Sequence, residues 1–142
     1  MKSEKDSLRL IVDTNRIIAA LIRYSISRRI ITHLDAELYT IGVSEREIAG
    51  YKSLILKKAG LNEVELDVVF EKIRERMIIL EDNLVLTMIK EAKEIMDKID
   101  PDETAFIAAA LAIKADIWSD DKHFQKQKNV KVWKTSDLMR VL

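Results

Sequence analysis

Apolar residues along this chain follow two spacings, one typical of strands and the other of helices. Residues 8–12 are rich in strand-forming side chains and predict a first strand. Directly after it, Ile17, Ile18, Leu21 and Ile22 recur at the spacing of one helix face. Further short apolar runs predict strands at residues 38–41, 116–119 and 130–133. Short strands separated by helices favour a parallel sheet covered by helices on both faces, an α/β fold.

The remaining apolar positions predict the helices between these strands. They mark helical stretches at residues 30–34, 48–59, 66–77, 85–96, 104–115 and 135–142. Gly60 is placed to end one of them. The stretch 104–115 is apolar on nearly every face, which is typical of a helix buried on two sides. The run 77–80 is apolar enough to be a strand, but we predict a helical hairpin there.

Length and composition limit the classes of protein that fit. A chain of 142 residues suits one domain, residues 1–142, and no repeat or linker divides it. Basic and acidic residues number 24 each, so a polyanion can be attracted only by a local patch. The absence of cysteine excludes disulfide frameworks, zinc–thiolate sites and thiol nucleophiles. The longest apolar stretch, 105–113, is too short to span a membrane, so we expect a cytoplasmic protein with no membrane partner.

Four acidic residues stand where the predicted pattern passes into a helix: Asp13, Glu47, Glu103 and Asp121. Residues beyond the carboxyl ends of parallel strands converge on one crevice, so these carboxylates can share a site. Carboxylates that share a site repel one another unless a cation lies between them. Hard oxygen ligands of this kind suit Mg²⁺ or Mn²⁺. The pattern therefore predicts metal-assisted chemistry on a phosphate.

Each acidic position also has a purely structural interpretation. Glu47 and Glu103 each match the last position of a capping box, and the first residues of these boxes are Ser44 and Asp100. The other two can stabilise a helix dipole by roughly 0.3–1 kcal/mol each. Asp13 favours the metal interpretation most, because it follows a buried strand directly. Burying an unpaired carboxylate costs several kcal/mol, more than a capping hydrogen bond returns.

The order of these motifs resembles the PIN-domain nucleases, and most closely the VapC-like archaeal and bacterial branch. The motifs are IVDTN before a helix, a mid-chain Glu that opens a helix, an acidic residue that leads an Ala-rich helix, and IWSDDKHF near the end. The resemblance covers residues 8–142. It implies a three-layer α/β/α fold with a central parallel sheet of about four to five strands. It also implies a Mg²⁺- or Mn²⁺-dependent ribonuclease that hydrolyses single-stranded RNA. The toxin of a toxin–antitoxin pair is one such ribonuclease.

The family's functional residues are carried over by position. Its catalytic and metal-binding acidic residues fall on Asp13, Glu47, Glu103 and Asp121. Asn15 and Ser119 fall on its polar supporting positions, where ordinary turn and cap residues fit as well.

Two positions depart from the family pattern. Glu103 stands where the family usually has Asp, so Asp100 or Asp102 can supply or share that ligand. Asp120 stands where a neutral residue is usual, which leaves the choice between it and Asp121 open. A displacement of about 1 Å can cost roughly a hundredfold in rate. The alternative function is therefore a catalytically weak PIN-like module that binds RNA or a partner protein.

Substrate and partners follow from the same comparison. Arg16 and Lys122 lie within three residues of a proposed ligand and are expected to contact substrate phosphates. His123 is a weaker candidate for substrate contact. The resemblance implies a homodimer and, for a toxin, an antitoxin protein that places a basic side chain among the carboxylates. A receiver-like protein with an Asp nucleophile fits less well, because no Lys is well placed after the last strands.

Overall fold

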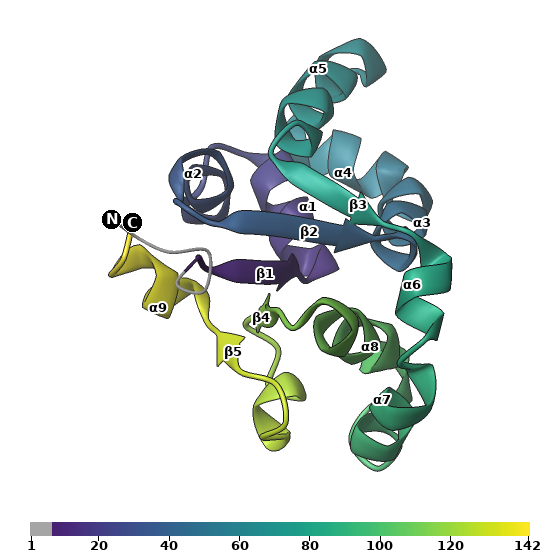
Figure 1. Ribbon diagram of the computed structural model, residues 1–142. Coiled ribbons are helices and arrows are strands. Elements are labelled where there is room, and N and C mark those ends of the chain that lie inside the picture. Colours follow the sequence, from purple (N-terminus) through teal and green to yellow (C-terminus); the bar gives the residue numbers. More distant parts are fainter. Residues whose placement is uncertain (1–6) are drawn as a thin grey trace.

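The computed structural model describes residues 7–142, and within them five strands form one parallel sheet (Figure 1). The order across the sheet is β3-β2-β1-β4-β5, and every neighbouring pair is parallel. The strands are β1 (Arg9–Val12), β2 (Glu37–Ile41), β3 (Met77–Leu80), β4 (Asp116–Trp118) and β5 (Val132–Trp133). The predicted parallel α/β/α fold is confirmed.

Helices cover both faces of this sheet. One face carries α1 (Thr14–Ile22), α2 (Ile26–His33), α3 (Gly42–Gly50), α4 (Lys52–Ala59), α5 (Glu63–Arg74) and α9 (Thr135–Met139). The other face carries α6 (Asp82–Leu86), α7 (Ile89–Met96) and α8 (Thr104–Ile113). Short 3₁₀ turns lie at Pro101–Glu103 and Phe124–Lys126. Within residues 7–142 no helix has the length and apolar character needed to cross a bilayer.

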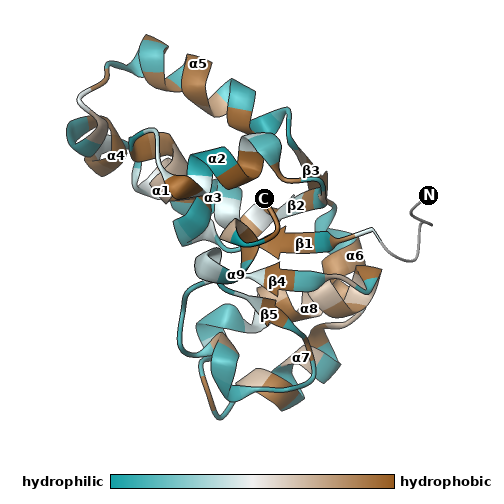
Figure 2. Ribbon diagram, turned by 90° about the vertical axis from the view of Figure 1, so that its left-hand side faces the viewer, coloured by the Kyte–Doolittle hydropathy of each residue, from teal (hydrophilic) through white to brown (hydrophobic). Residues whose placement is uncertain are grey.

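The central strand β1 divides the core into two layers. Side chains alternate across a strand, so Leu10 and Val12 pack toward α1 and α2 while Ile11 packs toward α8. Figure 2 shows β1 and β4 as hydrophobic strands between the two helical layers. Parallel strands buried on both faces need continuous apolar runs, which is why residues 8–12 are recognisable as a strand in the sequence.

Helix α8 is buried on several sides, as its sequence predicts. Phe106–Ala110 are all buried, and the helix packs against β1, β4, α6 and α7. Pro101 stands at the start of the preceding 3₁₀ turn, where its missing N–H leaves no bond unmade. This rigid element holds Glu103 at its N-terminal end.

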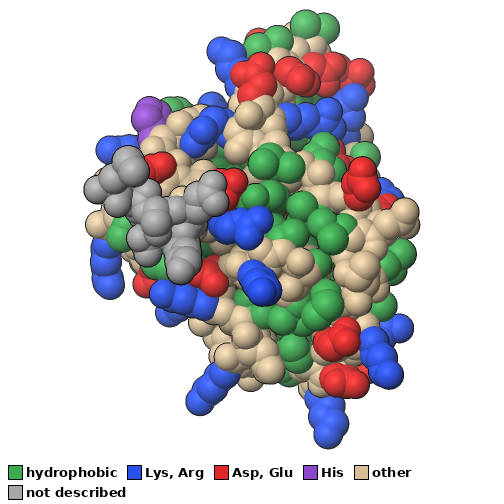
Figure 3. Space-filling view, in the orientation of Figure 1, with side chains coloured by type: hydrophobic (Ala, Val, Ile, Leu, Met, Phe, Trp, Pro, Cys, Tyr) green, Lys and Arg blue, Asp and Glu red, His purple; other side chains and the backbone are tan. Residues whose placement is uncertain are grey.

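The structure corrects the predicted helical hairpin, because residues 77–80 form the edge strand β3 and pair with β2. The helix before it ends at Arg74 rather than reaching Met77. Ile78 and Ile79 are exposed on this edge, and hydrophobic side chains are visible over the middle of the face in Figure 3. Acidic side chains gather instead over α5, at the top of that view.

Two long predicted helices are each divided in two. The stretch 48–59 breaks at Tyr51, between α3 and α4. The stretch 85–96 breaks between Leu86 and Ile89, where α6 ends and α7 begins. Apolar spacing continued across both breaks, so the pattern alone gave no sign of them. The prediction of a single domain over residues 1–142 includes residues 1–6, which lie outside the described part.

Candidate active site and metal centre

The carboxyl ends of β1 and β4 bring the first and last acidic motifs together. These strands are neighbours in the sheet, with Val12 opposite Trp118. The Asp13 N–H donates to the Trp118 carbonyl oxygen at 3.0 Å, which continues the strand pairing by one residue. Asp13 and the segment from Ser119 to Asp121 therefore leave the sheet at the same edge, the usual location of sites in open parallel sheets.

Asp13 is a buried carboxylate, with a relative exposure of 5%. It precedes α1, but its side chain makes no capping hydrogen bond. Ser119 Oγ instead donates to Asp13 Oδ2 at 2.7 Å, and Ser119 Oγ itself accepts the Asp121 N–H at 2.9 Å. Burial raises the pKa of Asp13, the Ser119 hydrogen bond opposes this, and the charge of Asp121 raises it further. The Asp13 side chain is thus bonded to the segment after β4 and not to the first turn of α1.

Glu103 has the most strongly shifted pKa of these carboxylates. Its pKa is raised to about 8, first by burial and then, in decreasing order, by the charges of Asp13, Asp121, Asp100 and Glu47. Its Oε2 atom is shielded from solvent and has no hydrogen-bond partner among the described residues. Its side chain makes no capping bond either, so no capping box forms with Asp100. A buried oxygen without a partner, surrounded by carboxylates, fits a hard divalent cation.

Glu47 approaches the site from α3 and is exposed to solvent. Thr14 Oγ1 donates to Glu47 Oε1 at 3.0 Å and lies 2.7 Å from Ser44 Oγ. Helix α3 begins at Gly42, so Ser44 is inside it and does not cap it. Thr14 was not singled out from the sequence, and its position between two site residues at a strand end was the available signal.

Asp120 and Asp121 have different surroundings, although they are adjacent in the chain. Asp120 accepts the Thr135 N–H at 2.8 Å and the Thr135 hydroxyl at 2.7 Å, and it pairs with Arg16 at 3.1 Å. It therefore ties the start of α9 to the sheet edge. Asp121 turns instead toward His123 and Asp100. These contacts favour Asp121 over Asp120 as the partner of Asp13, Glu47 and Glu103 in the acidic cluster.

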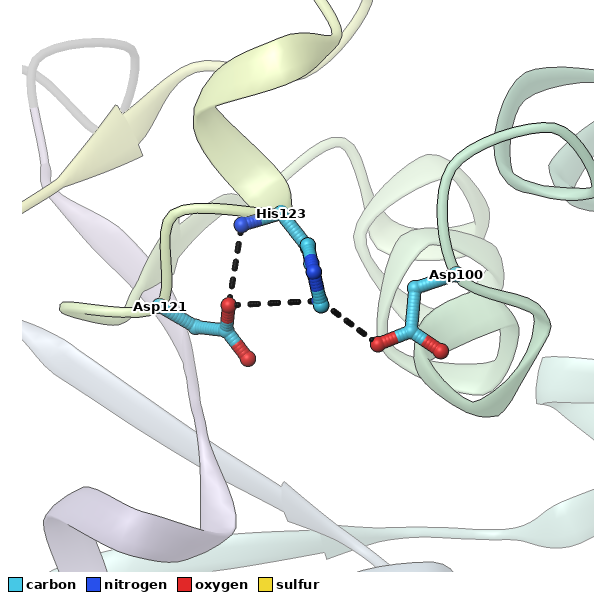
Figure 4. Close-up of side chains that lie close together, drawn as sticks. All are labelled: Asp100, Asp121 and His123. Carbon is cyan, nitrogen blue, oxygen red and sulfur yellow. Dashed lines mark hydrogen bonds and ion pairs between the residues drawn. The ribbon is translucent and has the colours of Figure 1, made fainter.

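Asp100, Asp121 and His123 form a group of side chains that could hold a metal ion (Figure 4). His123 Nδ1 is 2.7 Å from Asp100 Oδ2 and 3.5 Å from Asp121 Oδ1. The His123 N–H also donates to Asp121 Oδ1 at 2.9 Å. One ligand atom from each residue lies within 4.8 Å of the others. Asp102, the other candidate from the sequence, is exposed and contributes its N–H to Asp100 Oδ1 at 3.1 Å.

A pocket of about 210 Å³ is lined by Asp13, Asn15, Arg16, Asp120 and Asp121, whereas Glu47 and Glu103 are not among its lining residues. Asn15 is exposed at its rim. The Arg16 charge lowers the pKa of Asp13, against the larger effect of burial. Lys122 is exposed and is not among the lining residues. Of the two predicted phosphate contacts, the structure brings only Arg16 to the pocket.

These features define a parallel α/β/α protein with an acidic crevice at the carboxyl edge of its sheet. The chain belongs to the PIN-domain family, whose sequence model, described as PIN domain, matches residues 11–142. The resemblance seen in the sequence is thereby confirmed. The family consists of nucleases that use divalent metal ions.

Two solved structures resemble this chain in fold. One is VapBC2 from Rickettsia felis bound to a DNA fragment from its promoter, with a TM-score of 0.69 and 12% identity over 89% of this chain and 98% of that chain. The other is PAE2754 from Pyrobaculum aerophilum, with a TM-score of 0.60 and 16% identity over 94% of this chain and 89% of that chain. No curated protein sequence matches the chain. At these identities the likeness establishes the fold alone.

Proposed function

We propose that this chain is a divalent-metal-dependent ribonuclease that hydrolyses phosphodiester bonds in single-stranded RNA. The observation that carries the proposal is the buried Glu103 Oε2 atom, which has no hydrogen-bond partner among the described residues and lies among other carboxylates. Such an arrangement is costly unless a cation compensates it. Membership of a nuclease family gives the proposal its reaction class.

The metal ligands we propose are Asp13, Glu103 and Asp121, with Glu47 completing the set. Oxygen donors of this kind suit Mg²⁺ or Mn²⁺. When bound, such a cation supplies Lewis-acid activation of water and neutralises charge on the phosphate.

Neighbouring side chains hold these carboxylates in place. Ser119 donates to Asp13 and accepts the Asp121 N–H, so it fixes the two relative to each other. Thr14 donates a hydrogen bond to Glu47 and so holds that carboxylate. Partners of this kind typically affect metal affinity or activity by about 10–100-fold. Arg16 lines the pocket and is the proposed contact to a substrate phosphate, with Asn15 at the rim and Lys122 further out.

We also propose that the chain works in the cytoplasm as one domain, forms a homodimer and has an antitoxin partner. The fold likeness to VapBC2 supports a toxin of a toxin–antitoxin pair. An antitoxin segment with a basic side chain suits the acidic pocket, because the positive charge would replace the cation there.

The test is cleavage of a mixed single-stranded RNA by the pure protein in Mg²⁺, Mn²⁺ or EDTA. We expect cleavage that requires the metal and falls to background in Asp13→Asn and Glu103→Gln. Matched controls are Asp97→Asn and Glu91→Gln, which make the same chemical changes at exposed positions and should leave the rate unchanged. Cleavage that persists in EDTA or in Asp13→Asn contradicts the proposal.

The alternative of a binding module has its own signature in the same experiment. The longer side chain of Glu103, where the family usually has Asp, is the feature that favours it. A parent protein that folds and binds RNA but cleaves it in no divalent ion supports the binding module.

A further inference from the structure

A second and larger groove of about 590 Å³ lies next to the acidic pocket and carries the opposite charge. Three cationic side chains, Arg16, Arg23 and Lys58, line it together with Ser25 and Ser27 at the start of α2. None of its described lining residues is acidic. Its lining comes mainly from α1, α2 and α4, and α1 packs against both of the other two helices (Figure 1).

The groove adjoins the acidic pocket. Arg16 lines both of them. Thr135, which lines the groove, donates two hydrogen bonds to Asp120, which lines the pocket. A chain molecule lying in the groove therefore leads directly to the carboxylates.

Two of the three cations are available to bind an anion. Arg23 and Lys58 are exposed, and neither forms an ion pair within residues 7–142. Arg28 lies nearby but is used internally, because its Nε donates to the Ala20 carbonyl at 2.6 Å and its Nη2 to the Leu21 carbonyl at 3.3 Å. Arg23 and Lys58 thus remain free to contact a ligand, whereas Arg16 already pairs with Asp120.

A polyanion needs such a groove to reach this active site. The net charge of the chain is zero and the site itself is acidic, so neither draws RNA in. Another pocket, of about 670 Å³, does not supply the attraction, because it mixes Glu91 and Glu94 with Lys126 and Lys128. In the groove beside Arg16, by contrast, the positive charges of Arg23 and Lys58 have no acidic partner in the described part of the chain, and the groove lies next to the acidic pocket.

We propose that this groove binds the sugar–phosphate backbone of the RNA strand on one side of the cleaved bond. Arg23 and Lys58 contact successive phosphates, and Arg16 leads the strand into the acidic pocket. The inference rests on the proposed ribonuclease function, for which it names the path of the substrate.

The experiment measures the binding of a fluorescein-labelled oligouridine by fluorescence anisotropy, in EDTA and over a series of salt concentrations. The variant is Arg23→Glu/Lys58→Glu, and the matched control is Lys126→Glu/Lys128→Glu, which changes the net charge equally. Each phosphate contact on a single strand contributes about 0.7 to the slope of log affinity against log salt. We expect the groove variant to lose about 1.4 from that slope and at least roughly tenfold in low-salt affinity. The control should keep the parent values, and thermal unfolding should show that both variants fold.

The result that overturns the proposal is a groove variant with parental affinity and slope, or a control that weakens binding as much. An acidic protein segment would then be the better occupant of the groove. Metal-dependent cleavage, measured on the same proteins, separates the two proposals. If the parent protein cleaves RNA and the groove variant binds RNA as tightly as the parent, the proposed role of the groove is wrong and the nuclease proposal stands. Binding that depends on the groove, with no cleavage in any divalent ion, refutes the nuclease alone.

Discussion

Glu103 links the chemistry of the site to the stability of the fold. Its pKa is about 8 in the folded protein, against an ordinary value of 4.5. Between these two values the folded state binds more protons than the unfolded state. The free energy of unfolding of the metal-free protein therefore falls as the pH rises from about 4.5 to about 8. The raised pKa of Asp13 acts in the same direction.

We predict that the thermal midpoint in EDTA falls across this pH range, and that Glu103→Gln reduces the fall. The variant cannot ionise, so only Asp13 and any smaller contributions remain. Calorimetry of both proteins at several pH values measures the effect. Glu91→Gln, at an exposed position of α7, is the control and should follow the parent. An equal fall in the parent and in Glu103→Gln would show that Glu103 does not carry the dependence.

The sequence indicated which carboxylates stand at the ends of strands and the starts of helices, but not which side chains hold them. Asp13 was recognisable because a buried strand runs directly into it. The contacts of Ser44 were not recognisable, because a capping-box pattern describes neighbours in sequence and Ser44 bonds to Thr14 on another helix. The pairing of His123 with Asp100 also depends on how the 3₁₀ turn and the loop after β4 pack.

The elements were predicted best where two observations agreed. Residues 9–12 combine strand-forming side chains with a polar stop, and they form β1. Residues 77–80 had only an apolar run, which suits a short strand or a helix equally, and the partner β2 decided the outcome. The breaks at Tyr51 and between Leu86 and Ile89 were missed because apolar spacing continues across each helix junction.

Gly60 ends α4, and its backbone is left-handed, with φ 67° and ψ 32°. Its N–H donates to the Leu56 carbonyl at 2.9 Å, which closes the helix. We predict that Gly60→Ala lowers the free energy of unfolding by about 1 kcal/mol, because a Cβ disfavours this conformation. A Cβ there would meet no atom within 4 Å, so the cost is confined to the backbone.

Gly50 offers a matched comparison at the end of α3. It has ordinary backbone angles, and a Cβ would again meet nothing within 4 Å. Gly50→Ala should therefore be neutral or stabilise by up to about 1 kcal/mol. Urea unfolding of the two variants gives both values. Equal effects at Gly50 and Gly60 would show that the left-handed conformation does not determine the cost.

The whole molecule balances its charge overall but separates it locally. Acidic and basic residues are equal in number, yet an acidic pocket and a basic groove share the lining residue Arg16. The repulsion among the carboxylates is a property of the assembled fold, because it exists only when β1, β4 and α8 bring them together. Anything that relieves the repulsion must therefore stabilise the folded state.

A divalent cation should provide this relief. A ligand that binds only the folded state at about 100 times its Kd adds about 2.7 kcal/mol. For a domain of this size each kcal/mol raises the thermal midpoint by roughly 2–8 °C. We predict a rise of that order with Mg²⁺ or Mn²⁺, larger near pH 8 than near pH 5, because at low pH the cation must displace the proton on Glu103.

Thermal unfolding with and without the cation, at matched ionic strength, measures this rise. Asp13→Asn should abolish most of it, whereas Asp97→Asn should preserve it. A shift of equal size in NaCl would instead reflect general screening of the carboxylates. A rise that is specific to divalent ions, needs Asp13 and grows with pH requires a cation inside the cluster, because no site elsewhere on the surface would respond to all three changes.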